Sequence, residues 1–212
     1  MSWIRKQIMP CKEIILGRLA TTYNNEVVSS EPKPANNYLK RAAVLIPLFL
    51  KNGEVYVLLT VRAKNMRSYG GDVAFPGGMR DKCDEDDVDT ATREAWEEIG
   101  LPKHDIEIIS QGPVFITKTN IMVIPVIGFI PNNFKPNLNV DEVEDSFCVP
   151  LLDFLKTDKH CHRIIDRYHL HEFTHNIRNK TYKTWGLTAA ICINIATVVF
   201  NQKPDFYFKS KL

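Results

Sequence analysis

The amino-acid sequence predicts a single α/β domain in which a sheet lies between helices. Its 212 residues are 44% hydrophobic, which is enough for one sizeable core. Several short apolar runs have the composition of strands, whereas residues 89–99 and 185–200 are expected to be helices. Strands that lie between two such helices favour an α/β/α layered arrangement.

The first 36 residues are predicted to precede this domain. A helix is expected at 12–21, followed by an extended link at the Pro-rich segment 31–34. The basic residues of 1–19 resemble a mitochondrial presequence only weakly, because Ser and Arg are not enriched there. We therefore expect residues 1–36 to be a helix and linker, and residues 37–205 to form the domain.

The strands are predicted from apolar runs bounded by turn residues. Residues 42–50 and 55–61 are expected to pair as a hairpin, because Asn52-Gly53 between them favours a tight turn. Further strands are expected at 106–111, 114–116, 122–130, 147–154 (which is also expected to enter a helical turn) and 169–175.

The last apolar stretch, 185–200, is expected to be a packed helix. It is shorter than a bilayer span and is interrupted by Thr188, Asn194 and Thr197, so we expect no membrane span. The net charge of +2 creates no large electrostatic field, and therefore implies neither a nucleic-acid partner nor an anionic membrane.

The cysteine pattern argues against both disulfides and a zinc site. The five cysteines are odd in number and lack the CxxC spacing, which is typical of reduced thiols. They are Cys11, Cys83, Cys148, Cys161 and Cys192. The segment His160-Cys161-His162 is expected to be a polar turn, because no second ligand pair accompanies it.

The predicted helix at 89–99 carries the most informative side chains of the chain. Glu94, Glu97 and Glu98 share one face, and like charges at that spacing repel one another. A hard divalent cation such as Mg²⁺ or Mn²⁺ between them would relieve this repulsion. The alternative is a solvated acidic face. The opposite face is more apolar and is expected to dock on the core; it comprises Thr92, Ala95, Trp96 and Ile99.

This segment resembles the Nudix box, the signature of metal-dependent hydrolases of nucleoside diphosphates linked to another group. The matching run is Arg93-Glu94-x-x-Glu97-Glu98-x-Gly100-Leu101, preceded by a Gly-Gly turn. The chain departs from the box by one extra residue between Gly78 and Arg93, and by Ala95 at the first aliphatic position. Counting forward from Gly78 selects Asp84 as the partner of the arginine, and counting back from Arg93 selects Glu85.

A second motif at 58–78 resembles the coenzyme A-cleaving branch of the same superfamily. It has the form L-L-T-x-R-[SA]-x3-R-x3-G-x3-F-P-G-G, and its specified positions include Arg62, Arg67, Gly71 and Phe75. The resemblance implies that these four bind the substrate. Planar guanidinium groups also suit phosphate oxygens, although either arginine could instead pair with a surface carboxylate.

Together the motifs imply a Nudix-type α/β/α sandwich with a mixed sheet and a metal-dependent diphosphatase. The implied metal ligands are Glu94, Glu97, Glu98 and the backbone carbonyl at Gly78, with Mg²⁺ or Mn²⁺ as the cofactor. The three glutamates are also the implied catalytic residues. Glu94 is the first candidate for general base, and the acidic stretch 141–145 offers a second.

The implied reaction is hydrolysis of coenzyme A or acyl-CoA to 3′,5′-ADP and 4′-phosphopantetheine or its acyl derivative. Two alternatives remain at this stage. One is a Nudix diphosphatase for ADP-ribose, dinucleotides or capped RNA, and the other is a non-catalytic binding module. The complete set of box glutamates favours an enzyme.

The predicted tail, residues 206–212, ends in Ser210-Lys211-Leu212. At the extreme C-terminus this tripeptide is typical of peroxisomal targeting and would be recognised by the import receptor. We therefore expect a peroxisomal enzyme.

Overall fold

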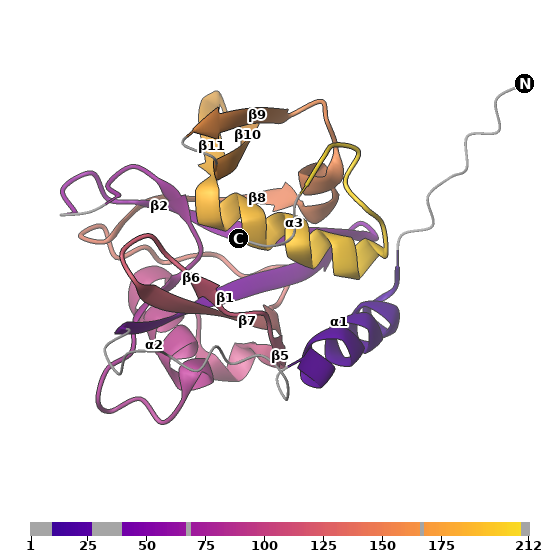
Figure 1. Cartoon of the computed structure of the whole chain (residues 1–212). Helices are drawn as coiled ribbons and strands as arrows, with labels where there is room; N and C mark the ends of the chain where they lie inside the picture. Colours follow the sequence, from indigo (N-terminus) through magenta and orange to yellow (C-terminus); the bar gives the residue numbers. More distant parts are fainter. Residues whose placement is uncertain (1–9, 27–39, 67–68, 166–167, 209–212) are drawn as a thin grey trace, which may run out of the picture.

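The computed structural model describes residues 10–26, 40–66, 69–165 and 168–208 (Figure 1). The predicted link at 31–34, Arg67 and the terminal tripeptide lie outside the described residues. The helices are α1 Lys12–Glu26, α2 Asp87–Ile99 and α3 Gly186–Phe200, with short 3₁₀ turns η1 Lys103–Asp105 and η2 Leu151–Leu155. The strands are β1 Lys40–Lys51, β2 Glu54–Arg62, β3 Val73–Ala74, β4 Gly77–Met79, β5 Glu107–Gln111, β6 Phe115–Ile116, β7 Ile121–Phe129, β8 Val143–Pro150, β9 His160–Ile165, β10 Tyr168–Ile177 and β11 Lys180–Trp185.

The larger sheet is mixed, as predicted, and β1 is at its centre. This strand pairs in parallel with β7 and antiparallel with β2 and β4. The strand order is β3-β2-β1-β7-β5, with β8 on β2 and β6 on β7. The β1–β2 hairpin is confirmed, because Asn52 and Gly53 both have positive φ, as its tight turn requires.

Helices cover both faces of this sheet, so the predicted α/β/α sandwich is confirmed. Figure 1 shows α2 and α3 on opposite sides of β1 and β7. Ala91 and Ile99 of α2 pack in one buried cluster with Leu45 of β1. Ile15 of α1 and Ile193 of α3 lie in a second cluster on the other face. No helix in the described ranges is long and apolar enough to cross a membrane.

The face that α2 turns to the core differs from the prediction at one residue. Thr92, Ala95 and Ile99 are buried, but Trp96 is 58% exposed and Glu98 is only 3% exposed. At 100° per residue, the buried stripe is centred near Ala95 and includes position 98, whereas position 96 falls beyond its edge. The helix therefore buries an acid and exposes an aromatic ring.

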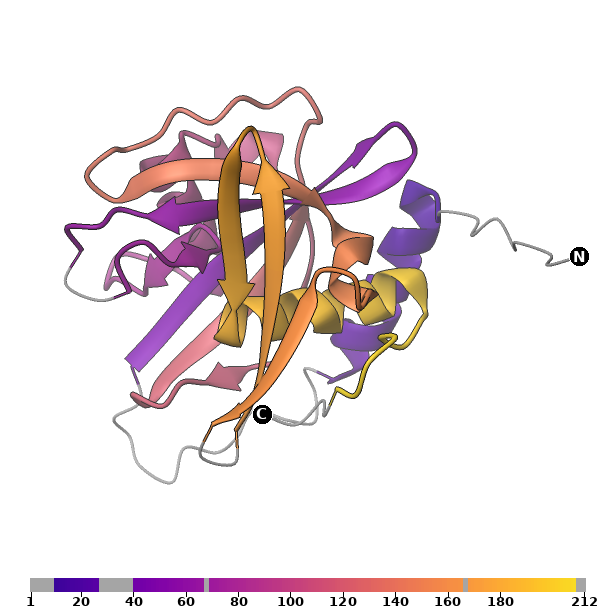
Figure 2. The ribbon, with the colours of Figure 1, turned by 90° about the horizontal axis from the view of Figure 1, so that it is seen from above.

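A separate three-stranded sheet, β9–β10–β11, was only partly predicted. The expectation of a polar turn at His160-Cys161-His162 is wrong, because these residues are in β9 and pair with β10. β11, with its run Lys180-Thr181-Tyr182-Lys183-Thr184, was not predicted, since it lacks an apolar pattern. Figure 2 shows the three strands side by side with α3 beneath them.

Candidate metal centre and active site

Helix α2 has well-defined ends that fix the positions of its glutamates. Asp86 is the N-cap, and its side chain accepts a hydrogen bond from the backbone N–H of Asp89 at 2.7 Å. Gly100 ends the helix with φ 67°, a left-handed conformation that glycine adopts without a steric penalty. Between these ends, Glu94 and Glu98 lie one turn apart on the same side.

Asp84, and not Glu85, is the partner of Arg93. Its carboxylate oxygens lie 2.8 Å from Arg93 Nε and 3.0 Å from Arg93 Nη2, and Thr90 Oγ1 donates to it at 2.9 Å. The adjacent guanidinium is the main reason that the pKa of Asp84 is held well below its usual value. The extra residue of the box therefore lies between Asp84 and Arg93, and the ion pair ties the loop to α2.

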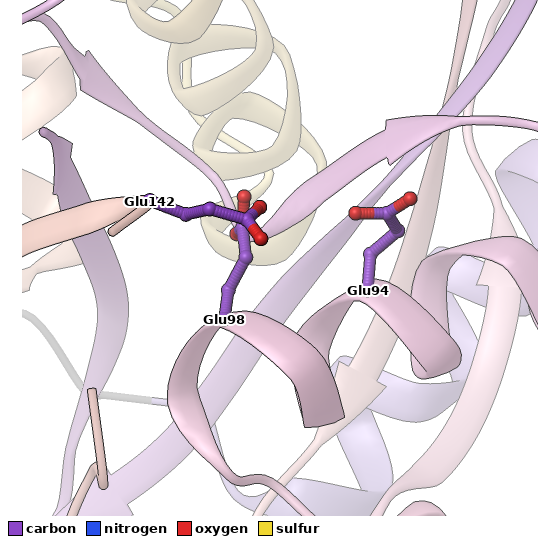
Figure 3. Close-up of side chains that lie close together, drawn as sticks. All are labelled: Glu94, Glu98 and Glu142. Atoms are coloured by element: carbon purple, nitrogen blue, oxygen red, sulfur yellow. The ribbon is translucent and has the colours of Figure 1, made fainter. Parts of the chain in front are cut away.

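Three carboxylates converge at the end of α2. One oxygen each from Glu94, Glu98 and Glu142 lie within 4.8 Å of one another. Figure 3 shows Glu94 and Glu98 rising from successive turns of α2, while Glu142 reaches across from the segment that leads into β8. Oxygen ligands around one Mg²⁺ or Mn²⁺ lie roughly 3–4 Å apart, so this group needs only a small closure to hold such an ion.

The buried charges of this cluster are costly in the absence of a cation. Burial raises the pKa of Glu98 to about 8, opposed by a hydrogen bond from Gly77 N–H at 3.2 Å and by the charge of Arg62. Burial also raises the pKa of Glu94, opposed by Arg93 at 2.9 Å. A divalent ion would stabilise both carboxylates in their charged forms. Charged carboxylates are in turn the oxygen ligands that Mg²⁺ and Mn²⁺ prefer, so this donor set fits a metal centre.

Two glycines bring the backbone against these carboxylates. A Cβ at Gly78 would lie 2.5 Å from the Glu94 carboxyl carbon, so only glycine fits this position without a shift. Gly77 has φ 154° and donates its N–H to Glu98. The predicted role of the Gly78 carbonyl as a metal ligand is compatible with this close approach and stays a prediction.

Arg62 lies at the end of β2, where a bulge follows Val61. Its Nη2 lies 3.1 Å from Met66 Sδ, whereas its Nε is buried without a hydrogen-bond partner. Within the described part of the chain, Arg62 forms no ion pair, contrary to the alternative of a surface pair. A buried N–H without a partner costs about 1–3 kcal/mol, and a phosphate oxygen would supply the missing acceptor.

The remaining predicted residues are not members of the three-carboxylate group. The Glu97 side chain is 47% exposed, and its Oε2 lies 3.1 Å from Arg93 Nη1. Phe75 is 4% exposed and is part of the core, and Gly71 (φ 83°) donates its N–H to Arg62 O at 2.9 Å. Their metal-binding and substrate-binding roles stay predictions.

Glu142 could not be selected from the acidic stretch 141–145 by sequence alone. Asn139 positions it, because Asn139 Nδ2 donates to Glu142 Oε1 at 3.1 Å and the backbone N–H of Asn139 donates to Glu98 O at 3.0 Å. Glu144 and Asp145 instead pair with lysines. No spacing rule links Asn139 or Glu142 to the box, so only the folded chain brings Glu142 to Glu94 and Glu98.

Comparison with known proteins identifies the family. The family model of the NUDIX domain matches residues 39–172, and the chain belongs to the Nudix hydrolase family. The peroxisomal coenzyme A diphosphatase NUDT7 of Mus musculus is 35% identical over 170 residues, which is 77% of this chain and 72% of that protein.

Two further relatives extend the comparison. Nudix hydrolase 15, mitochondrial, of Arabidopsis thaliana is 40% identical over 174 residues, 79% of this chain and 61% of the relative. The Nudix hydrolase NudL of Yersinia enterocolitica is 32% identical over 187 residues, 86% of this chain and 94% of the relative. The chain thus spans less than two thirds of the Arabidopsis protein. The relatives share the family and differ in the cellular locations that their names give.

Proposed function

We propose that this Nudix hydrolase cleaves the diphosphate of coenzyme A and its derivatives. The observation that carries the proposal is the buried Nε of Arg62, which has no hydrogen-bond partner and lies near three converging carboxylates. A phosphate oxygen of the substrate would supply the missing acceptor. Arg62 belongs to the motif at 58–78 that resembles the coenzyme A branch. The similarity to the mouse coenzyme A diphosphatase supports the same substrate class.

The residues of the site have complementary roles in this reaction. Glu94, Glu98 and Glu142 would hold the divalent cation, which when bound lowers the pKa of a water molecule and neutralises phosphoryl oxygens. Arg62 would donate to an oxygen of the diphosphate and hold it in line for attack. Water adds across one P–O bond of the bridge, and its proton passes to a carboxylate.

Two carboxylates are candidates for the group that accepts that proton. Glu94 is the first candidate, and its charged form is stabilised by Arg93 at 2.9 Å. Glu142 faces it from a different segment and receives a hydrogen bond from Asn139. Loss of the base is expected to lower kcat at saturating metal, whereas loss of a simple ligand is expected to raise the metal concentration required for half-maximal rate.

The test is incubation with CoA, acetyl-CoA, ADP-ribose or NADH in the presence of Mg²⁺ or Mn²⁺, followed by chromatographic separation of the products. We expect CoA to give 3′,5′-ADP and 4′-phosphopantetheine, and acetyl-CoA to give acetyl-phosphopantetheine. A chelated sample and the Glu98→Gln variant are the controls. Failure to cleave any CoA species, with cleavage of ADP-ribose or NADH, would replace the proposed substrate with another Nudix substrate.

We also propose a peroxisomal location, on the basis of Ser210-Lys211-Leu212. The name of the mouse relative supports it, while the Arabidopsis relative is named as mitochondrial. A fluorescent protein fused ahead of the chain should enter peroxisomes and bind the import receptor, and deletion of Leu212 should leave it outside. Unchanged import after that deletion would contradict the proposal.

A further inference from the structure

A concave region lies beside the end of β2, and we call it the Trp185 hollow. It has a volume of about 580 Å³ and lies between the larger sheet and the β10–β11 hairpin. Its walls include Val61, Gly71, Tyr182 and Trp185. A volume of about 300–1,000 Å³ is typical of sites for small molecules.

The hollow borders the end of β2 that carries Arg62, although Arg62 itself is not part of its wall. Val61, which precedes Arg62 in β2, lines it, as does Gly71, whose N–H donates to Arg62 O at 2.9 Å. Arg62 N–H in turn donates to the carbonyl of Asp72, which is another residue of the wall. Successive side chains of a strand point to opposite faces, so Val61 faces the hollow while Arg62 faces Glu98. A substrate whose diphosphate contacts Arg62 would reach the hollow by passing one of its two arms around the end of β2.

The charges of the hollow are already neutralised by one another. Its wall contains three lysines and four carboxylates, so it has no positive excess. Each lysine forms an ion pair with a carboxylate of the wall: Lys64 with Glu144 at 2.9 Å, Lys180 with Asp145 at 2.6 Å and Lys183 with Glu172 at 3.1 Å. A phosphate group here would have to break these pairs or face an excess of carboxylates.

Aromatic surface is available in the same place. Trp185 is 39% exposed, and its Nε1 donates to Asp72 Oδ1 at 3.4 Å, which holds the indole at the wall. Tyr182 stacks on Phe147 and donates its hydroxyl to Asp145 at 2.9 Å. Such rings with fixed polar tips suit an uncharged chain that carries amide groups and methylenes.

We propose that the Trp185 hollow binds the uncharged pantetheine arm of the substrate, and that the phosphorylated nucleoside lies outside it. This inference rests on the proposed function, since it assigns one arm of a coenzyme A substrate. β11 and Trp185 lie beyond residues 39–172, which the family model matches. The hollow thus adds substrate selection to a cleavage site that the family shares.

The test compares the two reaction products as inhibitors of CoA hydrolysis. In the Trp185→Ala variant, we expect KM for CoA and the inhibition constant of 4′-phosphopantetheine to rise about tenfold, the effect of losing one aromatic contact surface. The inhibition constant of 3′,5′-ADP should stay unchanged, as should kcat. The matched control is Trp96→Ala, which removes an exposed indole from α2 away from the hollow.

A second variant keeps the test valid if Trp185→Ala does not fold. Thr181 is exposed on the wall of the hollow, so Thr181→Trp should fill it and raise the same two constants. A rise for 3′,5′-ADP alone would overturn the inference by placing the nucleoside there, and no change for either product would also overturn it. Absence of CoA hydrolysis by the wild-type protein would instead overturn the proposed function.

Discussion

Helix α2 presents Glu94 and Glu98 from one short stretch of sequence, whereas the Trp185 hollow is assembled from segments that extend from Val61 to Trp185. The first region holds carboxylates whose pKa is raised by burial, and the second holds lysines that form ion pairs with carboxylates. The difference indicates a division of labour. In the proposed reaction the helix would provide the chemistry of cleavage, and the hollow would select what is attached to the diphosphate.

The sharpest contrast within the cleavage region is between Glu98 and Glu97. We expect Glu98→Gln to lower Mg²⁺-dependent kcat by about 10³-fold, because Glu98 is buried in the three-carboxylate group. The fall in kcat caused by Glu97→Gln should be at least tenfold smaller than that caused by Glu98→Gln, since the exposed Glu97 carboxylate pairs with Arg93. Steady-state kinetics and thermal melting measure both effects. Wild-type activity in a folded Glu98→Gln variant would refute the metal site. An equal fall in kcat in both variants would show that Glu97 is also part of it.

Asp84 is the next largest contributor, and its effect is on stability. Asp84→Ala should lower the free energy of unfolding by about 1.5–3 kcal/mol, because it removes the two hydrogen bonds that Arg93 donates to Asp84, while Glu94 and Glu97 remain as partners of Arg93. Glu85→Ala should change it by less than about 0.5 kcal/mol. Urea denaturation at pH 7 compares the two. A larger effect of Glu85→Ala would reverse the assignment.

The pH dependence of the same pair provides a control. The pKa of Asp84 is lowered in the folded state by Arg93. Its stabilisation is therefore present above the unfolded pKa, near 4, and is lost as the pH falls below it. The difference between the wild type and Asp84→Ala should shrink in acid.

On the other side of the molecule, His175 makes the β10 region sensitive to acid. Burial lowers its pKa to about 4, although Asp153 lies 3.8 Å from its Nδ1 and Lys159 pairs with Asp153. The neutral form is favoured in the folded state, so its contribution is complete above pH 6.5 and is lost as the pH falls toward 4. The resulting fall in the free energy of unfolding should reach about 2–3 kcal/mol.

The matched variants are His175→Gln and His104→Gln. Glutamine stays neutral, so His175→Gln should flatten the dependence of unfolding free energy on pH between about 4 and 6.5. The His104 side chain is 84% exposed, and its replacement should leave that dependence unchanged. If the unfolding free energy depends on pH equally steeply in both variants, His175 is not the source of that dependence.

The smallest predicted effect concerns the position of Glu142. Asn139→Ala removes the hydrogen bond to Glu142 Oε1, so the Glu142 carboxylate should no longer be held in place beside Glu94 and Glu98. We expect kcat at pH 7 to fall about tenfold with little change in KM. Asn137→Ala is the control, because only its backbone N–H bonds to α2. An unchanged kcat would show that Asn139 does not position Glu142 for the reaction.

The two regions also differ in how far the sequence predicts them. The end of α2 at Gly100 follows from local spacing, whereas the helix begins at Asp87, two residues before the predicted start. Of the predicted carboxylates, Glu94 and Glu98 belong to the three-carboxylate group and Glu97 does not. The choice between Asp84 and Glu85 depends on the path of a loop, which spacing leaves open. Glu142 reaches the site through tertiary contacts alone.

The second sheet was harder to predict for another reason. The exposed sides of β9 and β11 carry polar residues, and only the pairing with β10 makes them strands. The hollow depends on that pairing and was therefore not foreseen. Trp96 shows the same limit within α2, since the sequence alone did not fix which side of the helix faces the core.

The most direct test of the account is the ratio of kcat/KM for CoA to that for ADP-ribose, measured with Mg²⁺ in the wild type and in Trp185→Ala. The account predicts a ratio well above one in the wild type and a roughly tenfold lower ratio in the variant. A ratio below one in the wild type, or the same ratio in both proteins, would contradict it.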